Sequence, residues 1–345
     1  MKHQILNSLG EPVVLNAREQ ARADALQRQY NSELKNALGY EISITTLTAI
    51  SKRVVEQKFF TIPPADFLPV RVGEGAWSSE IITYRDFSVG GDFETGIINT
   101  AASDARLAET DAGVDAIHVP IVNWAKQVSW SFFDLQLAAK SGNWDLVTAK
   151  ERSRKKNWDL GIQKIAFLGS AQNSNIMGLL SQSTVNSNTS VITKYIKSMS
   201  ESEFSTFVGA IVGAYRTNCA YTAMPTHFIM PELDYDGLAA PVSATYPNIS
   251  KLDYLTMVFR TITRNPNFQI LPCAYSDQIN NNLSLNRYVL LNYDEDTIRM
   301  DIPVDYTNTL QNTINGLQFQ NVGYGQFTGA QAYRPLEVLY FDFAN

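Results

Sequence analysis

"NWDLVTAKERSRKKNWDLGIQKIAFLG", residues Asn143 to Gly169, decides the fold because it predicts the longest helix of the chain. Residues three or four positions apart mark one face of that helix: Trp144, Val147, Glu151, Arg154, Trp158, Gly161 or Ile162, Ile165 and Leu168. Asn143 suits a helix N-cap, and Gly169 stands where a helix ends on a left-handed residue. We expect a helix over 143–168, with four structural residues: Trp144, Trp158, Ile165 and Gly169.

The next residues, "SAQNSNIMGLLS" (170–181), are small and polar enough to suggest a loop that cradles an anion. Anions favour the N-terminus of a helix, whereas this loop follows a C-terminus with exposed carbonyl groups. The loop is therefore expected to turn the chain, so that 176–180 return to the core.

The 345 residues are enough for about two domains. An amphipathic helix is expected over 17–38, on an N-terminal arm. "WSSEIITYRDFSVGGDFE" and "GVDAIHVPIVNWAKQVSWSF" predict two long strands of a hairpin, whose polar tip we expect a neighbouring subunit to order. Ser200 and Glu203 form a capping-box pattern before a mixed α/β region. The end of the chain again resembles strands, which are expected to return to the first sheet.

Composition excludes several classes of protein. A net charge of −6 and a pI near 5.2 argue against a protein whose affinity comes mainly from neutralising nucleic-acid phosphates. Cys219 and Cys273 have no metal-binding spacing and form no disulfide framework. No signal peptide and no run of about 20 apolar residues is present. We expect folding in the cytoplasm and no membrane, metal or cofactor.

Catalytic chemistry has little support. The three histidines, His3, His118 and His227, form no metal-binding motif, and the nucleophile-elbow, phosphate-loop and dinucleotide motifs are absent. An acidic cluster could bind a hard cation, although a solvated turn explains it better: Asp294, Glu295, Asp296 and Asp301.

The basic run "KERSRKK" and one tryptophan are the candidate contact residues. The basic run could contact DNA phosphates or an acidic neighbour. We favour the interpretation that it forms a solvated helix face or a contact between subunits. Its candidates are Lys150, Arg152, Arg154, Lys155 and Lys156. Trp77 is the tryptophan that we expect at an interface, because tryptophan is common among association anchors.

The stretch from "VSWSFFDLQLAAKSG" through the helix to "GSAQNSNIMGLLS" resembles the major capsid proteins of tailed bacteriophages, with the Hong Kong 97 phage capsid fold. The similarity in sequence is specific over about 124–181. Elsewhere the chain is similar to the family only in the order of its structural parts. It implies an α+β fold in five parts: an N-terminal arm and connector (1–69), an extended loop hairpin (70–125), a peripheral domain with the spine helix 143–168 (126–199), an axial α/β domain (200–309) and returning strands of the peripheral or axial sheet (310–345).

The resemblance also implies a function without catalysis. Copies would form hexamers and pentamers of an icosahedral head shell around double-stranded DNA, in a virion assembled in the bacterial host's cytoplasm. The axial domains would meet at capsomer centres, and the extended loop would lie over the adjacent subunit. Its candidate contacts are Trp77, Phe87, Phe93 and Arg106. A portal protein is the further partner, and scaffold and decoration proteins stay open.

Two features depart from some members of this family. No lysine lies between Lys58 and Lys126, which excludes an isopeptide cross-link through the loop. The arm is short, so a separate scaffold or none is expected, and a chain beginning at Met1 fits an untrimmed shell protein. Two alternatives remain: an encapsulin-like nanocompartment shell of the same fold, and a small-molecule enzyme that uses the acidic cluster or His227.

Overall fold

The computed structural model describes residues 61–89, 111–140, 146–243, 245 and 247–344, together with two short strands near the N-terminus. The chain divides into two compact units, 1–59 with 132–146 and 60–131 with 147–345. In the first unit, β1 (Ile5–Leu6) pairs antiparallel with β2 (Pro12–Val13), and α2 spans Phe132–Lys140. The expected arm helix over 17–38 lies outside the described residues.

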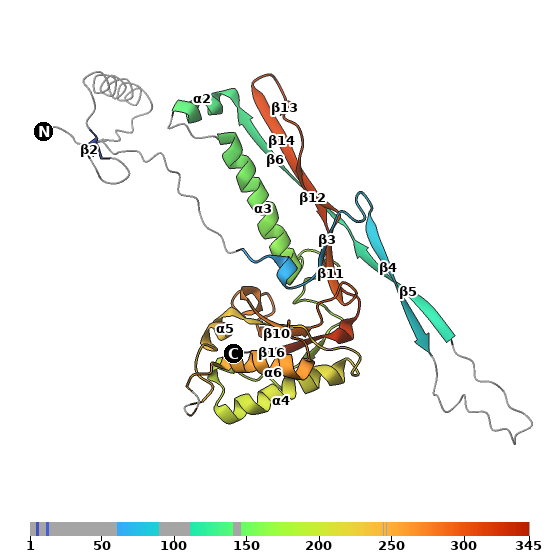
Figure 1. Ribbon diagram of the computed structural model, residues 1–345. Coiled ribbons are helices and arrows are strands. Elements are labelled where there is room, and N and C mark those ends of the chain that lie inside the picture. The colour runs from blue at the N-terminus through green and yellow to red at the C-terminus, as the bar shows by residue number, and fades with distance from the viewer. Residues whose placement is uncertain are drawn as a thin grey trace, which may run out of the picture. The chain divides into compact units, whose positions relative to one another are not determined.

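The spine helix, α3 (Leu146–Leu168), is the longest helix of the described residues and confirms the main prediction (Figure 1). Positions 143–145, including Trp144, lie outside the described residues. Trp158 is buried, and its ring lies 5.2 Å from that of Trp124 and 5.9 Å from that of Phe327. Ile165 packs partly buried against the same core. The predicted apolar face therefore fixes the helix to its neighbours.

A long ribbon of strands lies along the spine helix (Figure 1). β6 (Val122–Ser131) pairs antiparallel over its whole length with β14 (Gln318–Phe327). Two short strands pair with the other edge of β14: β12 (Val304–Asn308) and β13 (Asn312–Thr313). A Cβ on Gly325 would lie 2.5 Å from the Trp158 ring, so glycine lets the ribbon approach the helix closely. The expected return of the chain's end to the first sheet holds for β14, which pairs with β6, whereas the strands after it join other sheets.

The second strand of the predicted hairpin is in fact two strands. β5 (Asp111–Pro120) pairs with β4 (Glu80–Val89), whereas β6 belongs to the ribbon. The change falls at Pro120 and Ile121, where proline has no N–H with which to extend the ladder. The hairpin of the larger unit is thus β4 and β5 alone. The five-part division of the chain stays a prediction.

A five-stranded sheet, named the axial sheet after the predicted axial domain, has the order β7, β16, β10, β8 and β9: Asn186–Asn188, Val338–Phe343, Asn286–Leu291, His227–Pro231 and Gln269–Cys273. Alternate residues enter two different cores. Phe228, Leu290 and Phe341 pack with α4 (Glu201–Asn218) and α6 (Lys251–Thr263). Ile229, Val289 and Tyr340 pack with the C-terminal end of α3. Burial on both faces explains why these strands are almost continuously apolar.

Smaller elements complete the larger unit. A three-stranded sheet has the order β15, β11 and β3: Ala330–Ala332, Ile298–Ile302 and Val70–Val72. The α5 helix (Glu232–Gly237) follows β8 directly. In the described residues, four short 3-10 helices connect the larger elements: η1 (Pro64–Asp66), η3 (Ile196–Ser198), η4 (Ala274–Ser276) and η5 (Pro335–Glu337).

Gly169 ends the spine helix as predicted, with a left-handed φ of +73°. The last four carbonyl oxygens of α3 all accept hydrogen bonds, from Gly169 N (Ile165 O, 2.9 Å), Leu179 N (Ala166 O, 2.7 Å), Leu180 N (Phe167 O, 2.8 Å) and Ser181 Oγ (Leu168 O, 3.0 Å). Three of these donors come from the returning end of the loop 170–181. That loop therefore caps the C-terminus of α3, in keeping with the predicted turn of the chain.

Replacing Gly169 with valine should destabilise the subunit by at least about 3 kcal/mol, because a β-branched residue is strained at this φ. Its Cβ would also lie 2.5 Å from Ile176 O. Urea denaturation of the unassembled protein measures the loss. Gly161→Ala is the matched control inside the same helix, since its Cβ meets nothing within 4 Å, and it should add about 0.5–1 kcal/mol. Equal stability of the two variants would contradict this account.

Candidate functional site

The hairpin of β4 and β5 is attached to the rest of its unit through one face. Arg299 Nη2, on β11, donates to Thr83 Oγ1 at 2.8 Å, and Arg85 Nη1 donates to Tyr333 O at 3.4 Å. Val119 is buried on the same face of the hairpin. These contacts hold the root of the hairpin against β11 and the residues that follow β15.

The opposite face of the hairpin is open and carries three exposed apolar side chains beside the exposed Glu80–His118 pair. Ile82, Tyr84 and Val114 lie on this face and are exposed, Tyr84 by 71% of its surface. A two-stranded hairpin with an uncovered apolar face is marginally stable in water on its own. We call Ile82, Tyr84 and Val114 the open hairpin face; the sequence analysis missed it, although the alternation of Ile82 and Tyr84 in the predicted strand was the available signal.

Trp77 lies at the root of the hairpin and is 71% exposed. Its backbone adopts a left-handed φ of +65°, and its N–H donates to Gln326 Oε1 at 2.9 Å. Its side chain lines a groove of about 500 Å³ with Trp124 and Tyr324. A left-handed residue of this size costs about 1–3 kcal/mol, so the hydrogen bond to Gln326 helps to hold an unfavourable conformation that presents the ring.

The other predicted hairpin contacts are not placed. Phe87 lies on β4 opposite Gly113, and nothing is described of its side chain. Phe93 and Arg106 lie outside the described residues. Their role as subunit contacts stays a prediction.

Arg154, a candidate contact for DNA or a neighbour, is buried against the ribbon, on the helix face that its spacing from Trp158 predicts. Its guanidinium donates to neutral oxygens of β12, β14 and β6: Tyr306 OH (2.8 Å), Asn321 Oδ1 (2.8 Å), Asn321 O (2.9 Å), Asn308 Oδ1 (3.0 Å) and Lys126 O (3.4 Å). A Cβ on Gly323 would lie 2.6 Å from Arg154 Nε, so glycine makes room for this side chain. Arg154 thus fastens the spine helix to the ribbon and is unavailable to DNA.

The remaining basic residues of the run lie nearer the surface. Lys150 Nζ donates to Ser129 O at 2.8 Å, so it also contacts the ribbon. Arg152 and Lys155 are exposed and Lys156 is half-buried. Because 3.6 residues make one turn, these three side chains lie on the helix side away from Arg154. A contact of this side with DNA or a neighbour stays a proposal.

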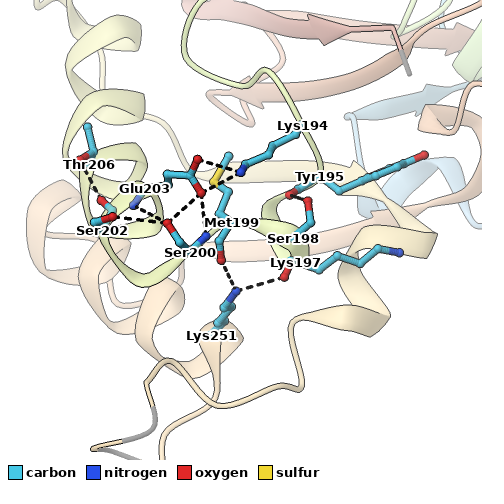
Figure 2. Close-up of polar contacts among 10 residues, drawn as sticks. All are labelled: Lys194, Tyr195, Lys197, Ser198, Met199, Ser200, Ser202, Glu203, Thr206 and Lys251. Carbon is cyan, nitrogen blue, oxygen red and sulfur yellow. Dashed lines mark hydrogen bonds and ion pairs between the residues drawn. The ribbon is translucent and has the colours of Figure 1, made fainter.

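A polar cluster ties the starts of α4 and α6 together (Figure 2). Lys194 Nζ donates to both carboxylate oxygens of Glu203 at 2.8 and 2.7 Å, and the predicted capping box between Ser200 and Glu203 is confirmed. The hydrogen bonds from Lys194 and, as the next largest cause, those from Ser200 lower the pKa of Glu203 to about 2. The buried Lys251 ammonium donates to Met199 O at 2.9 Å and Lys197 O at 3.1 Å. The segment before α4 is therefore fixed from both sides.

The candidate catalytic groups have identifiable partners in the structure. His227 Nδ1 lies 2.9 Å from Thr226 Oγ1, its ring stacks on Tyr293, and burial lowers its pKa. Asp294 and Asp296 lie 3.7 and 3.6 Å from the Arg334 guanidinium. Asp301 differs from these two residues because it is buried, and its Oδ1 accepts a hydrogen bond from Arg71 Nε at 2.9 Å. The favoured interpretations, a strand histidine and a surface turn, fit these contacts.

The described part of the chain shows neither a metal-binding group nor a membrane-spanning helix. No group of three or more His, Cys, Asp or Glu side chains there could hold a metal ion. None of the described helices has the length and hydrophobicity needed to cross a bilayer.

Solved structures show which class of protein this fold defines. The capsid of Myoviridae phage XM1 matches with a TM-score of 0.71 and 13% identity, over 88% of this chain and 99% of that one. The capsid of the native GTA particle gives 0.54 and 13%, over 90% and 100%. A structure from Mycobacterium phage Ogopogo gives 0.52 and 10%, over 85% and 95%. The fold is that of tailed-phage capsid proteins, as predicted.

The family follows from the sequence itself. The family model described as Major capsid protein matches residues 94–343, so the chain belongs to the major capsid protein family. It is a structural family and not a class of enzymes. No curated protein matches the sequence. These findings favour a phage capsid over the nanocompartment alternative.

Replacing Arg154 with methionine should lower the free energy of unfolding by about 3 kcal/mol, because the two buried oxygens of Asn321 and the half-buried Tyr306 hydroxyl lose their donor. Lys155→Met is the control on the exposed side of the same helix and should cost less than about 1 kcal/mol. Urea denaturation compares the two variants. If both lose the same small amount, Arg154 does not fasten the helix to the ribbon.

The Glu203 cluster should make stability depend on pH. The folded-state pKa of about 2 lies below the ordinary 4.5, so stabilisation by charged Glu203 is complete above pH 4.5 and is lost as pH falls towards 2. Thermal unfolding of wild type and Glu203→Gln, followed from pH 7 to pH 2, should differ near neutrality and converge in acid. Lys194→Met should change the same window, because it removes the other half of the ion pair. A difference that persists unchanged to pH 2 would refute the assignment.

Proposed function

We propose that copies of this chain assemble as hexamers and pentamers into an icosahedral head shell around double-stranded DNA. The subunit acts without catalysis, in a virion that is assembled in the cytoplasm of the bacterial host. Family membership supports a shell role. A portal protein is a further partner, and scaffold and decoration proteins join where the particular shell requires them.

The open hairpin face is the observation that carries the proposal. Its three large apolar side chains are held on a hairpin whose other face is already bonded to its own unit. Burying one such side chain contributes about 1.5–3 kcal/mol, so a neighbour that covers this face gains several kcal/mol at each contact. Repeated around a closed ring, such modest contacts add up to a stable shell. Trp77 extends the same contact at the hairpin root.

Contact with DNA is weak in this proposal. The chain has a net charge of −6, and the buried Arg154 cannot contribute. The side of the spine helix with Arg152, Lys155 and Lys156 is a local contact for phosphates or for an acidic neighbour. A shell that neutralises few phosphates leaves packaged DNA free to move.

Tyr84→Asp should abolish shells while leaving the subunit folded, because it places a charge on the face that a neighbour covers. Tyr221→Asp is the matched control: Tyr221 is 74% exposed, against 71% for Tyr84, and lies after α4, away from the hairpin strands. Electron microscopy counts shells, and circular dichroism checks the fold of both variants. Normal shells from Tyr84→Asp would refute the role of the open hairpin face. A wild-type protein that forms no shells at high concentration would refute the proposed function itself.

A further inference from the structure

The turn between β13 and β14, residues 314–317, contains the only Asn–Gly pair of the sequence, Asn315–Gly316 (Figure 1). Glycine has no Cβ, so the main-chain nitrogen of Gly316 can approach the side-chain amide carbon of Asn315 without a steric clash. A bond between these two atoms closes a succinimide ring. The sequence therefore singles out Asn315 as a residue whose amide the chain itself can convert.

Water has free access to this turn in the subunit. Every residue from 307 to 318 is exposed, and Ile314 and Leu317, which flank the pair, are exposed by 58% and 50%. Succinimide formation begins when hydroxide removes the proton of the Gly316 N–H, and a water molecule later opens the ring. Both reagents can therefore reach the atoms on which they act.

The fold restrains the reaction at the nitrogen that must attack. Gly316 N donates to Thr313 Oγ1 at 2.9 Å, and the Thr313 hydroxyl donates onward to Gln318 O at 3.3 Å. Hydroxide removes the proton of a hydrogen-bonded main-chain N–H only when that bond opens, which is why such groups exchange slowly with solvent. The Thr313 hydroxyl therefore lowers the fraction of time in which Gly316 N can attack.

The amide that is attacked is also held in place. Asn315 Oδ1 accepts from Leu317 N at 3.2 Å and from Gln318 N at 2.8 Å, and Ile314 N donates to Gln318 O at 2.9 Å. These contacts fix the Asn315 side chain and stabilise the closed turn. The reaction therefore waits for the turn to open locally.

We propose that Asn315 is a modification site, at which the subunit slowly converts an amide into a carboxylate, and that Thr313 sets the rate. The bond between Gly316 N and Asn315 Cγ forms and the Cγ–Nδ2 bond breaks. The Gly316 N proton passes to hydroxide, and Nδ2 takes a proton from water and leaves as ammonia. Water then opens the ring at Cγ to give aspartate, or at the main-chain carbonyl carbon of Asn315 to give isoaspartate.

The conversion changes both the charge and the shape of the turn. From Tyr306 to Tyr333 the sequence has no Asp, Glu, Lys, Arg or His, although 18% of the chain is charged, so the new carboxylate is the first charge of this stretch. In the aspartate product the carboxylate can still accept from Leu317 N and Gln318 N, and an ionised acceptor makes stronger hydrogen bonds. In isoaspartate the main chain runs through the former side chain, so these two bonds lose their geometry.

Mass spectrometry of the purified chain tests the proposal. The protein is kept warm at mildly alkaline pH and digested with trypsin, and fragment spectra of the peptide that follows Arg299 locate the change from amide to acid. Acid should accumulate at Asn315. The internal controls are Asn308, Asn312 and Asn321, which are followed by Thr or Val and should stay amides.

Variants of two threonines test the restraint. Thr313→Ala should raise the rate at Asn315 by about two- to tenfold, because one hydrogen bond no longer has to open. Thr313→Ser keeps the acceptor oxygen and should restore the wild-type rate. Thr309→Ala is the matched control, since Thr309 Oγ1 also accepts from a main-chain N–H, that of Val322 at 2.9 Å, and its loss should leave the rate at Asn315 unchanged.

The outcomes bear on this inference alone, because the reaction needs no assembled shell and does not rest on the proposed function. Wild type with no more acid at Asn315 than at Asn308, Asn312 and Asn321 overturns the modification site. Equal rates in wild type and Thr313→Ala overturn the role of Thr313. So does a Thr309→Ala variant that is accelerated as much as Thr313→Ala.

Discussion

The hydrogen bonds that close the C-terminus of α3 are the constraint on which the larger unit depends. A buried carbonyl without a donor costs a few kcal/mol, and this helix end lies where the spine helix meets the axial sheet. The loop that returns to supply the donors also continues the network: Tyr340 OH donates to Leu179 O, and Gln182 Nε2 donates to Ala330 O at 2.7 Å. Helix, axial sheet and β15 are thereby fixed by one set of contacts.

Buried polar groups with several hydrogen-bond partners also fix other internal contacts of the subunit. Gln163 accepts from Ile62 N and donates to Tyr275 OH, which ties the chain before β3 to the spine helix. Asp234 accepts from Ile196 N, Lys197 N and Tyr288 OH within the axial region. Buried polar groups with several partners define geometry, because each partner must lie at a set distance and angle. The subunit is therefore held internally by directional bonds.

The sequence predicted features whose causes are local. The helix over 143–168, the end at Gly169 and the capping box at Ser200 each depend on neighbours within a few residues, and the structure confirms them in the described range. The helical spacing put Arg154 on the same face as Trp158, but its partners Tyr306, Asn308 and Asn321 could not be predicted because they lie far along the chain. The change of partner strand at Pro120 and Ile121 was also missed, since strand propensity carries no information about which strand is paired.

The exposed surfaces follow a different rule from the interior, and the proposed function gives the reason. A chain that forms both hexamers and pentamers must make the same contact at more than one angle. Bidentate or multiply bonded polar contacts lose their geometry when the angle changes, whereas apolar burial is non-directional and depends on the area covered. The exposed side chains that define the open hairpin face, Ile82, Tyr84 and Val114, are apolar, and the Glu80–His118 pair lies beside them. Rigid polar contacts inside the subunit and tolerant apolar contacts between copies therefore let one chain serve both rings.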